Sequence, residues 1–132
     1  MYINQTRVKH VLGMANEHTD DFNCWGATKF IADPNTPILE WVDHNAMTEW
    51  LTSNYKPIHR TEVREGDIVA LFSGDEPESM RLVHTAFCVE KNRFVHKMGR
   101  NVARLETLNR VLKEYSRQAD KFIFVRRNEL CV

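Results

Sequence analysis

Residues Asp21–Thr28, with the sequence DFNCWGAT, are the stretch from which the organisation of this chain is predicted. Asn23 is a residue type that caps helix N-termini, and an apolar stripe runs from Ala27 to Ala32, so we expect a helix to begin at Cys24. A cysteine in the first turn of a helix lies beside unpaired backbone N–H groups and the positive end of the helix dipole, and both stabilise a thiolate. The stretch therefore predicts a reactive thiol at Cys24.

The composition is that of one ordinary globular domain spanning residues 1–132, with 42% hydrophobic and 27% charged residues. Lys plus Arg and Asp plus Glu both number 18, so the charge balance predicts neither a nucleic-acid partner nor an anionic membrane. No apolar stretch approaches the length of a membrane span, and no export signal is visible. With three cysteines and no export signal, we expect reduced thiols and a protein that is cytoplasmic as synthesised.

Hydrophobic periodicity predicts helices in the first part of the chain and strands in the second. We expect helices at residues 5–16, 24–32, 44–53 and 105–117, and strands at residues 67–72, 81–90, 93–98 and 122–126. This order predicts an α+β fold in which N-terminal helices pack on a mostly antiparallel sheet.

Two histidines, His84 and His96, lie on consecutive predicted strands. The side-chain period of a strand is two, so the length of the loop between the strands decides whether the two rings share a face. A three-residue loop at 90–92 places them on one face, and a two-residue loop at 91–92 places them on opposite faces. Asn92 tolerates the left-handed conformation that a three-residue loop needs at its end, so we expect the two histidines to be neighbours.

The face of the strand that carries His84 continues with two small residues, Ala86 and Cys88. We expect the small-residue face of the helix that begins at Cys24 to pack there, bringing the thiol to His84. A thiol at a helix N-terminus, an imidazole to deprotonate it and a third group to orient the imidazole are the three parts of an activated nucleophile. A zinc site built from Cys24, His84, Cys88 and His96 is disfavoured, because His84 and Cys88 are far apart on one strand. No metal and no cofactor are therefore expected.

Four short motifs follow one another along the chain: Asn23–Gly26 (NCWG), Glu65–Val69 (EGDIV), Val83–Phe87 (VHTAF) and Arg93–His96 (RFVH). In order and spacing they resemble the NlpC-type cell-wall peptidases, a papain-like group of cysteine amidases that use Cys, His and a third polar residue. The corresponding motifs of that family read Asp-Cys-Ser-Gly, Pro-Gly-Asp-Leu-Val, His-Val-Gly-Ile and Phe-Ile-His. The resemblance extends over roughly residues 16–99.

The resemblance implies that Cys24 is the nucleophile, His84 the base and then the acid, and His96 the residue that orients His84. The family's tyrosine upstream of the cysteine is absent, and His18 is the expected replacement as a donor near the oxyanion. Trp25 stands where the family has serine, which implies a differently shaped substrate cleft.

The expected function is that of a cysteine peptidase or amidase that cleaves an amide or isopeptide bond. The resemblance implies peptidoglycan stem peptides as the substrate, in which case phage lysis or a secretion route would deliver the enzyme to the cell wall. Two alternatives stay open at this point. One is an intracellular deamidase, deconjugating or acyl-transferring enzyme on the same scaffold, and the other is a catalytically inactive binding or inhibitor module.

Overall fold

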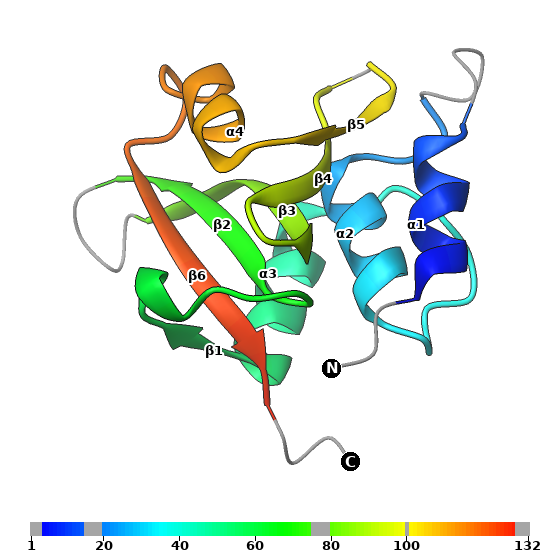
Figure 1. Cartoon of the computed structure of the whole chain (residues 1–132), viewed down its shortest axis with the longest axis horizontal. Coiled ribbons are helices and arrows are strands. Elements are labelled where there is room, and N and C mark those ends of the chain that lie inside the picture. The colour runs from blue at the N-terminus through cyan, green and yellow to red at the C-terminus, as the bar shows by residue number, and fades with distance from the viewer. Residues whose placement is uncertain (1–3, 15–19, 75–79, 100, 129–132) are drawn as a thin grey trace.

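Figure 1 shows the computed structural model of the protein, which describes residues 4–14, 20–74, 80–99 and 101–128. In these residues six strands form one sheet in the order β1-β6-β2-β3-β4-β5, and four α-helices pack around it. Every pair of neighbouring strands is antiparallel. The expected α+β class is thereby confirmed, whereas the papain-like identity of the fold stays a prediction.

Helices and strands alternate along the chain more often than the sequence predicts, because β1 follows α3 and β5 precedes α4. The helices are α1 (Gln5–Leu12), α2 (Cys24–Ala32), α3 (His44–Asn54) and α4 (Leu108–Glu114). The strands are β1 (Tyr55–Ile58), β2 (Ile68–Ser73), β3 (Arg81–Glu90), β4 (Arg93–Lys97), β5 (Ala103–Glu106) and β6 (Lys121–Arg127), and a 3₁₀ turn, η2 (Arg60–Glu62), follows β1. No helix in the described ranges is both long and apolar enough to cross a membrane.

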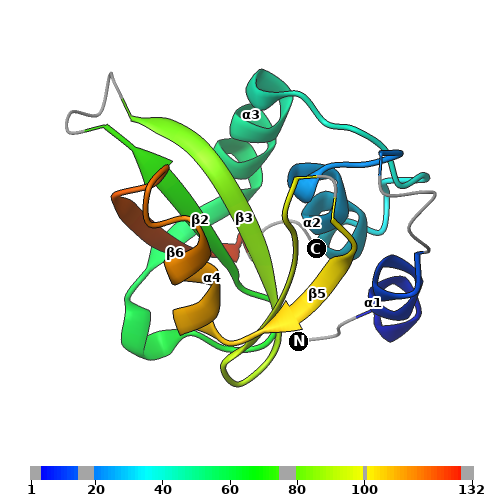
Figure 2. The same cartoon turned by 90° about the horizontal axis from the view of Figure 1, so that it is seen from above.

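The sheet carries helices on both faces. Along β2, Ile68 and Ala70 join the core that α1, α2 and α3 cover, while Val69 and Leu71 join a second core that contains Val111 of α4. This alternation is the period of two that a strand buried on both sides requires. Figure 2 shows α2 and α4 on opposite sides of β3.

The start of α2 is built by Asn23, as the sequence predicts. Its side-chain oxygen accepts a hydrogen bond from the backbone N–H of Gly26 at 2.9 Å, and its amide donates to the carbonyl of Val42 at 2.8 Å. A Cβ at Gly26 would lie 1.8 Å from the carbonyl oxygen of Glu40, so only glycine lets the 40–42 segment approach the helix this closely. The helix that begins with Cys24 is thus fixed at its first turn.

The helix predicted at residues 105–117 is wrong in its first part. Residues Ala103–Glu106 form the edge strand β5, in which Leu105 pairs with Val95 of β4, and α4 begins only at Leu108. The spacing of Leu105 and Leu108 imitates a helical stripe, but the backbone of β4 offers hydrogen bonds that a longer helix would leave unpaired. Strand β1 was not predicted either, and its Pro57 is tolerated because β1 lies at the sheet edge.

The β3–β4 hairpin reaches the predicted register by a different route. Glu90 pairs with Arg93 across the two-residue turn 91–92, and a register shift between Cys88 and Glu90 follows. Because the shift adds one residue to β3, Cys88 faces Phe94 exactly as it would with the predicted three-residue loop. Asn92 has the expected left-handed conformation, with φ of 56°.

The prediction that α2 packs on the face of Ala86 and Cys88 is wrong. Those two residues pack in the core with Val111 of α4, whereas α2 lies on the other face of β3, where the hydroxyl of Thr85 donates to that of Thr28 at 2.8 Å. The small face of β3 is occupied by α4, a helix whose position the sequence did not indicate. Cys24 therefore approaches His84 from the opposite side of the sheet.

Candidate active site

The two predicted histidines lie side by side in the buried part of the sheet. His84, in β3, is 0% exposed and His96, in β4, is 1% exposed. His84 Nε2 and His96 Nδ1 are 2.9 Å apart, which is a hydrogen bond, and the rings meet edge to face. The expectation that both rings share one face is confirmed by this contact.

Both imidazoles are uncharged at neutral pH. Burial lowers the pKa of His84 well below 6.5, and proximity to His96 adds to the effect. Burial also lowers the pKa of His96 to about 4, although the carboxylate of Glu106 acts in the opposite direction. A neutral histidine is a base rather than an acid, so His84 is in the form that can accept a proton.

The outer nitrogens of the pair have no hydrogen-bond partner among the described residues. His84 Nδ1 and His96 Nε2 are both buried and unpaired, as is Glu114 Oε2, which lies 3.8 Å from His96 Nε2. A neutral imidazole carries one N–H, and the carboxylate of Glu114 favours it on His96 Nε2. His96 Nδ1 then accepts from His84 Nε2–H, which leaves a free lone pair on His84 Nδ1.

Cys24 lies next to the strand segment that carries His84. The pairing of β3 with β4 ends at Phe87 and Val95, so the backbone of Thr85 is free of β4, and its N–H points to the Cys24 sulfur. No hydrogen bond joins Cys24 to an imidazole in the described part of the chain. The sequence predicts that the thiol contacts His84, and the structure does not show that contact: the two side chains approach β3 from opposite sides of the sheet.

The expected acidic thiol is not found in this structure. Cys24 is partly exposed, but burial of its sulfur raises the pKa to about 11, and this outweighs the N–H groups of Thr85, Trp25 and Cys24 that stabilise the thiolate. The helix N-terminus acts in the predicted direction, yet desolvation is the larger effect. The resting state is therefore a neutral thiol beside a neutral histidine.

Three residues near the site were not singled out from the sequence. Tyr115, just after α4, stacks on His84 with ring centroids 3.9 Å apart. Glu114 ends α4 beside His96. Lys97 follows His96 in β4 and is 0% exposed, with its Nζ donating to the carbonyl of Gly99 and lying 5.0 Å from the Phe22 ring centre.

Lys97 provides a positive charge on the Cys24 side of the sheet. Burial lowers the pKa of Lys97, whereas the negative charges of Asp20 and of ionised Cys24 raise it. Strand alternation predicts that Lys97 faces away from His96, but the sequence predicts the Cys24 helix on the His96 side, so the place of Lys97 beside Cys24 was not predicted. Tyr115 and Glu114 gave no comparable signal, because their placement depends on where α4 packs.

The remaining predicted site residues are less central. Trp25 is partly buried, and its ring meets that of His44 in α3 edge to face at 5.6 Å. His18 lies outside the described residues. Asp67, just before β2, has a structural role, because it accepts from the backbone N–H of Arg64 at 2.9 Å.

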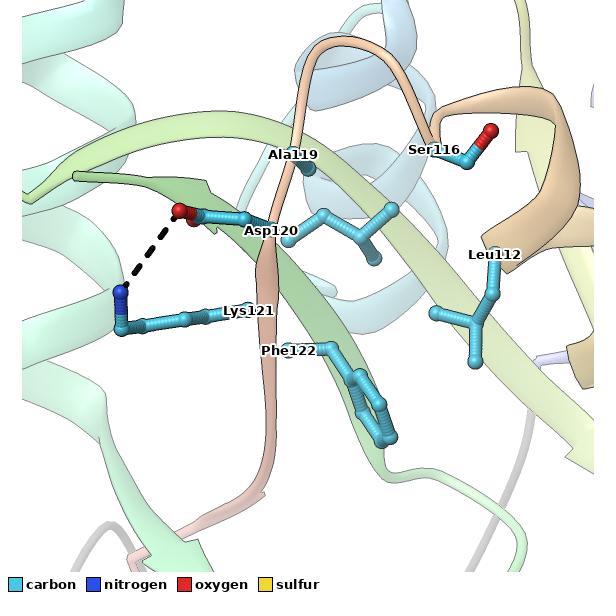
Figure 3. Close-up of a pocket in the computed structure, with 7 residues that line it drawn as sticks. Leu112, Ser116, Ala119, Asp120, Lys121 and Phe122 are labelled. Atoms are coloured by element: carbon cyan, nitrogen blue, oxygen red, sulfur yellow. Dashed lines mark ion pairs between the residues drawn. The ribbon is translucent and has the colours of Figure 1, made fainter. Parts of the chain in front are cut away.

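A pocket lies beside the histidines, between the end of α4 and the start of β6. Figure 3 shows its lining, which consists of Leu71, Leu112, Ser116, Ala119, Asp120, Lys121 and Phe122. Leu71 is the cross-strand partner of His84, so the pocket adjoins the site, but neither histidine nor Cys24 lines it.

Metal-ligating side chains gather at one place in the described residues. His96, Glu106 and Glu114 offer ligand atoms that all lie within 4.8 Å of one another. This cluster differs from the set of Cys24, His84, Cys88 and His96 that the sequence disfavours as a zinc site. The Cys88 thiol donates to the carbonyl of Glu90 at 3.2 Å.

Comparison of the chain with protein-family models, with curated proteins and with solved structures found no match.

Proposed function

We propose that this protein is a papain-like thiol hydrolase that cleaves an amide or isopeptide bond. Cys24 is the nucleophile, His84 the general base and then the general acid, and His96 the residue that orients His84. The observation that carries the proposal is the polarised histidine pair: a 2.9 Å bond between His84 Nε2 and His96 Nδ1, with His84 Nδ1 buried and unpaired among the described residues. That lone pair has no partner among the described residues, and Cys24 lies across the sheet from it, so the proposed proton transfer requires the thiol and His84 to move into contact when substrate binds.

Because the Cys24 thiol and the His84 imidazole are both neutral before the reaction, the proton is transferred during the attack on the substrate. As the Cys24 sulfur attacks the substrate carbonyl, the thiol proton moves to His84 Nδ1, so a thiol with a pKa of about 11 need not be ionised beforehand. The backbone N–H of Cys24, at the N-terminus of α2, stabilises the oxyanion, and His18 is the proposed second donor. His84 then protonates the leaving amine, the C–N bond breaks, and a thioester remains on Cys24.

Water completes the cycle. It attacks the thioester while His84 Nδ1 accepts one of its protons, and the proton returns to the sulfur as the carboxylic acid leaves. Glu114 supports this sequence, because a carboxylate at His96 Nε2 keeps the N–H of His96 on that atom and leaves His96 Nδ1 as an acceptor.

The proposed substrate is a peptidoglycan stem peptide, which is the substrate class that the motif resemblance implies. Wild-type protein incubated with purified sacculi is expected to release soluble peptides with new amino groups. Cys24→Ala and His84→Gln should each lower this rate about 10³-fold, because they remove the nucleophile and the base. Cys88→Ala is the matched control, because it removes a buried cysteine outside the site and should leave the rate nearly unchanged.

A peptide-based thiol-reactive probe distinguishes the other candidates. Labelling of Cys24 that requires His84, without release from sacculi, would move the substrate to an intracellular amide. If the probe does not label Cys24 and no peptide is released from sacculi, the enzyme proposal is contradicted. That outcome favours an inactive binding module, for which the buried sulfur of Cys24 is the supporting observation.

A further inference from the structure

The cluster of His96, Glu106 and Glu114 has a feature that a solvated acidic patch lacks. Its three side chains come from β4, β5 and α4, and the His96 side chain is 0% exposed with its Nε2 aimed at Glu114 and without a hydrogen-bond partner among the described residues. Glu114 Oε2 is also buried and has no hydrogen-bond partner among the described residues. The two atoms lie 3.8 Å apart, too far for a hydrogen bond, and an ion bound between them would satisfy both.

We propose that His96 Nε2, Glu106 and Glu114 bind one divalent transition-metal ion, and that the bound ion switches off the neighbouring base, His84. The switching part of this inference rests on the proposed thiol-hydrolase function, whereas the binding part does not.

The donor set fits a zinc-like ion. One imidazole and two carboxylates are ligand types that zinc accepts, with the fourth position left to water. Ligands of one tetrahedral zinc ion lie about 3.3 Å apart, so the 3.8 Å between His96 Nε2 and Glu114 Oε2 requires only a small closure. The two carboxylates also balance the charge of the ion.

Glu106 must leave its present partners to bind the ion. Its carboxylate lies 3.4 Å from Arg110 and 4.0 Å from Arg104, and those arginine side chains are 61% and 52% exposed. The Glu106 side chain is only 11% exposed, but both guanidinium groups lie largely in solvent, where each pair is screened, so a divalent ion can replace them. Both guanidinium groups can turn into solvent when the ion binds.

Metal binding changes which nitrogen of each histidine carries the proton. A metal on His96 Nε2 requires the lone pair of that atom, so the proton of neutral His96 must lie on Nδ1. Nδ1–H then donates to His84 Nε2, and the proton of His84 moves to Nδ1. The pair keeps two protons in total, but His84 Nδ1 loses the lone pair that would accept the thiol proton of Cys24. The ion is therefore an inhibitor of the base.

Titration calorimetry of the full chain with zinc chloride tests the site. We expect one equivalent to bind, with at least tenfold weaker binding in Glu106→Gln. Glu114→Gln is the second variant, should Glu106→Gln fail to fold. Glu49→Gln, an exposed glutamate on α3, and Cys24→Ala should both bind as the wild type does. The proposed site is overturned if the wild type does not bind one equivalent of zinc. It is also overturned if Cys24→Ala loses zinc binding while Glu106→Gln keeps it.

Nitrogen NMR of ¹⁵N-histidine-labelled protein tests the switch without any activity assay. Zinc is expected to convert His84 Nδ1 from an unprotonated to a protonated nitrogen, and an unchanged His84 would refute the switch. In a hydrolysis assay, zinc should lower the wild-type rate, and Glu106→Gln should resist this inhibition when its rate with zinc is compared with its own zinc-free rate. If zinc binds and the tautomer changes while no amide is cleaved, the proposed function fails and the metal site stands.

Discussion

Two buried polar clusters in the same sheet differ in how completely their hydrogen bonds are satisfied. Asp67 is 0% exposed, and its carboxylate accepts two bonds of 2.9 Å from Arg126 and a third from the backbone N–H of Arg64. In the second cluster His84 Nδ1, His96 Nε2 and Glu114 Oε2 have no hydrogen-bond partner among the described residues.

The difference separates a structural role from a chemical one. The Asp67 cluster ties the start of β2 to β6 and leaves no carboxylate oxygen free to react. The histidine cluster has one hydrogen bond between its two rings, and the outer nitrogen of each ring has no hydrogen-bond partner among the described residues. Unpaired buried atoms lower the stability of the fold, but they can accept or donate a proton or bind an ion. Trp25 Nε1, His44 Nε2 and Thr48 Oγ1 are also buried without a hydrogen-bond partner in the described part of the chain, so the candidate site is marked by its three unpaired atoms together with the His84–His96 hydrogen bond.

The largest expected effect on the structural side comes from Asp67→Asn. It removes the charge that compensates Arg126, whose side chain is 14% exposed, so the free energy of unfolding should fall by about 3 kcal/mol in urea denaturation. Catalytic turnover of the folded variant should stay close to that of the wild type. Asp120→Asn is the matched control, because Asp120 is 57% exposed and its ion pair with Lys121, drawn in Figure 3, is worth at most about 0.5 kcal/mol. Equal losses in the two variants would contradict the structural assignment of Asp67.

The sequence predicted best where a local rule and the tertiary structure agree. The bounds of α2 match the prediction because Asn23 caps its start and the residue before Pro34 disfavours a helical conformation. The hairpin register agrees with the prediction although the predicted three-residue loop is wrong: the turn has two residues, and an extra residue in β3 that the sequence did not indicate restores the alternation.

Features set by distant packing were not predictable. Leu105 fits a helical stripe by spacing, and only the neighbouring β4 shows that it belongs to a strand. The side of β3 on which α2 packs depends on α4 covering the other face, and Glu114 joins His96 for the same reason. The acidity of Cys24 was misjudged because a helix terminus is visible in the sequence and desolvation is not.

The pH dependence of Cys24 alkylation tests whether the proposed nucleophile rests as a neutral thiol near the histidine cluster. Because burial raises the pKa of the thiol from 9.0 to about 11, iodoacetamide should react slowly at pH 7, with a rate that rises through pH 11. The same shift makes Cys24 stabilise the fold below pH 9, a contribution lost as the pH rises through 11. Mass spectrometry of the alkylated site in a Cys88→Ala background gives the rate, and urea-unfolded protein serves as the control. An inflection below pH 7 would mean that Cys24 and His84 form an ion pair, contrary to the neutral resting state.

The smallest effect is expected from Glu114→Gln, which tests the open end of the histidine cluster. The amide can still approach His96 Nε2, but it has lost the charge that holds the N–H of His96 on that atom, 3.8 Å from Glu114 Oε2. We expect kcat to fall about tenfold, roughly 1.4 kcal/mol, with KM unchanged, because the variant alters the base and not the binding of substrate. Glu90→Gln, a 61% exposed glutamate at the end of β3, should alter neither constant. A purely structural role for Glu114 would lower stability and leave kcat of the folded protein intact. A tenfold loss of kcat at unchanged stability would instead show that the unpaired atoms of this cluster serve the reaction.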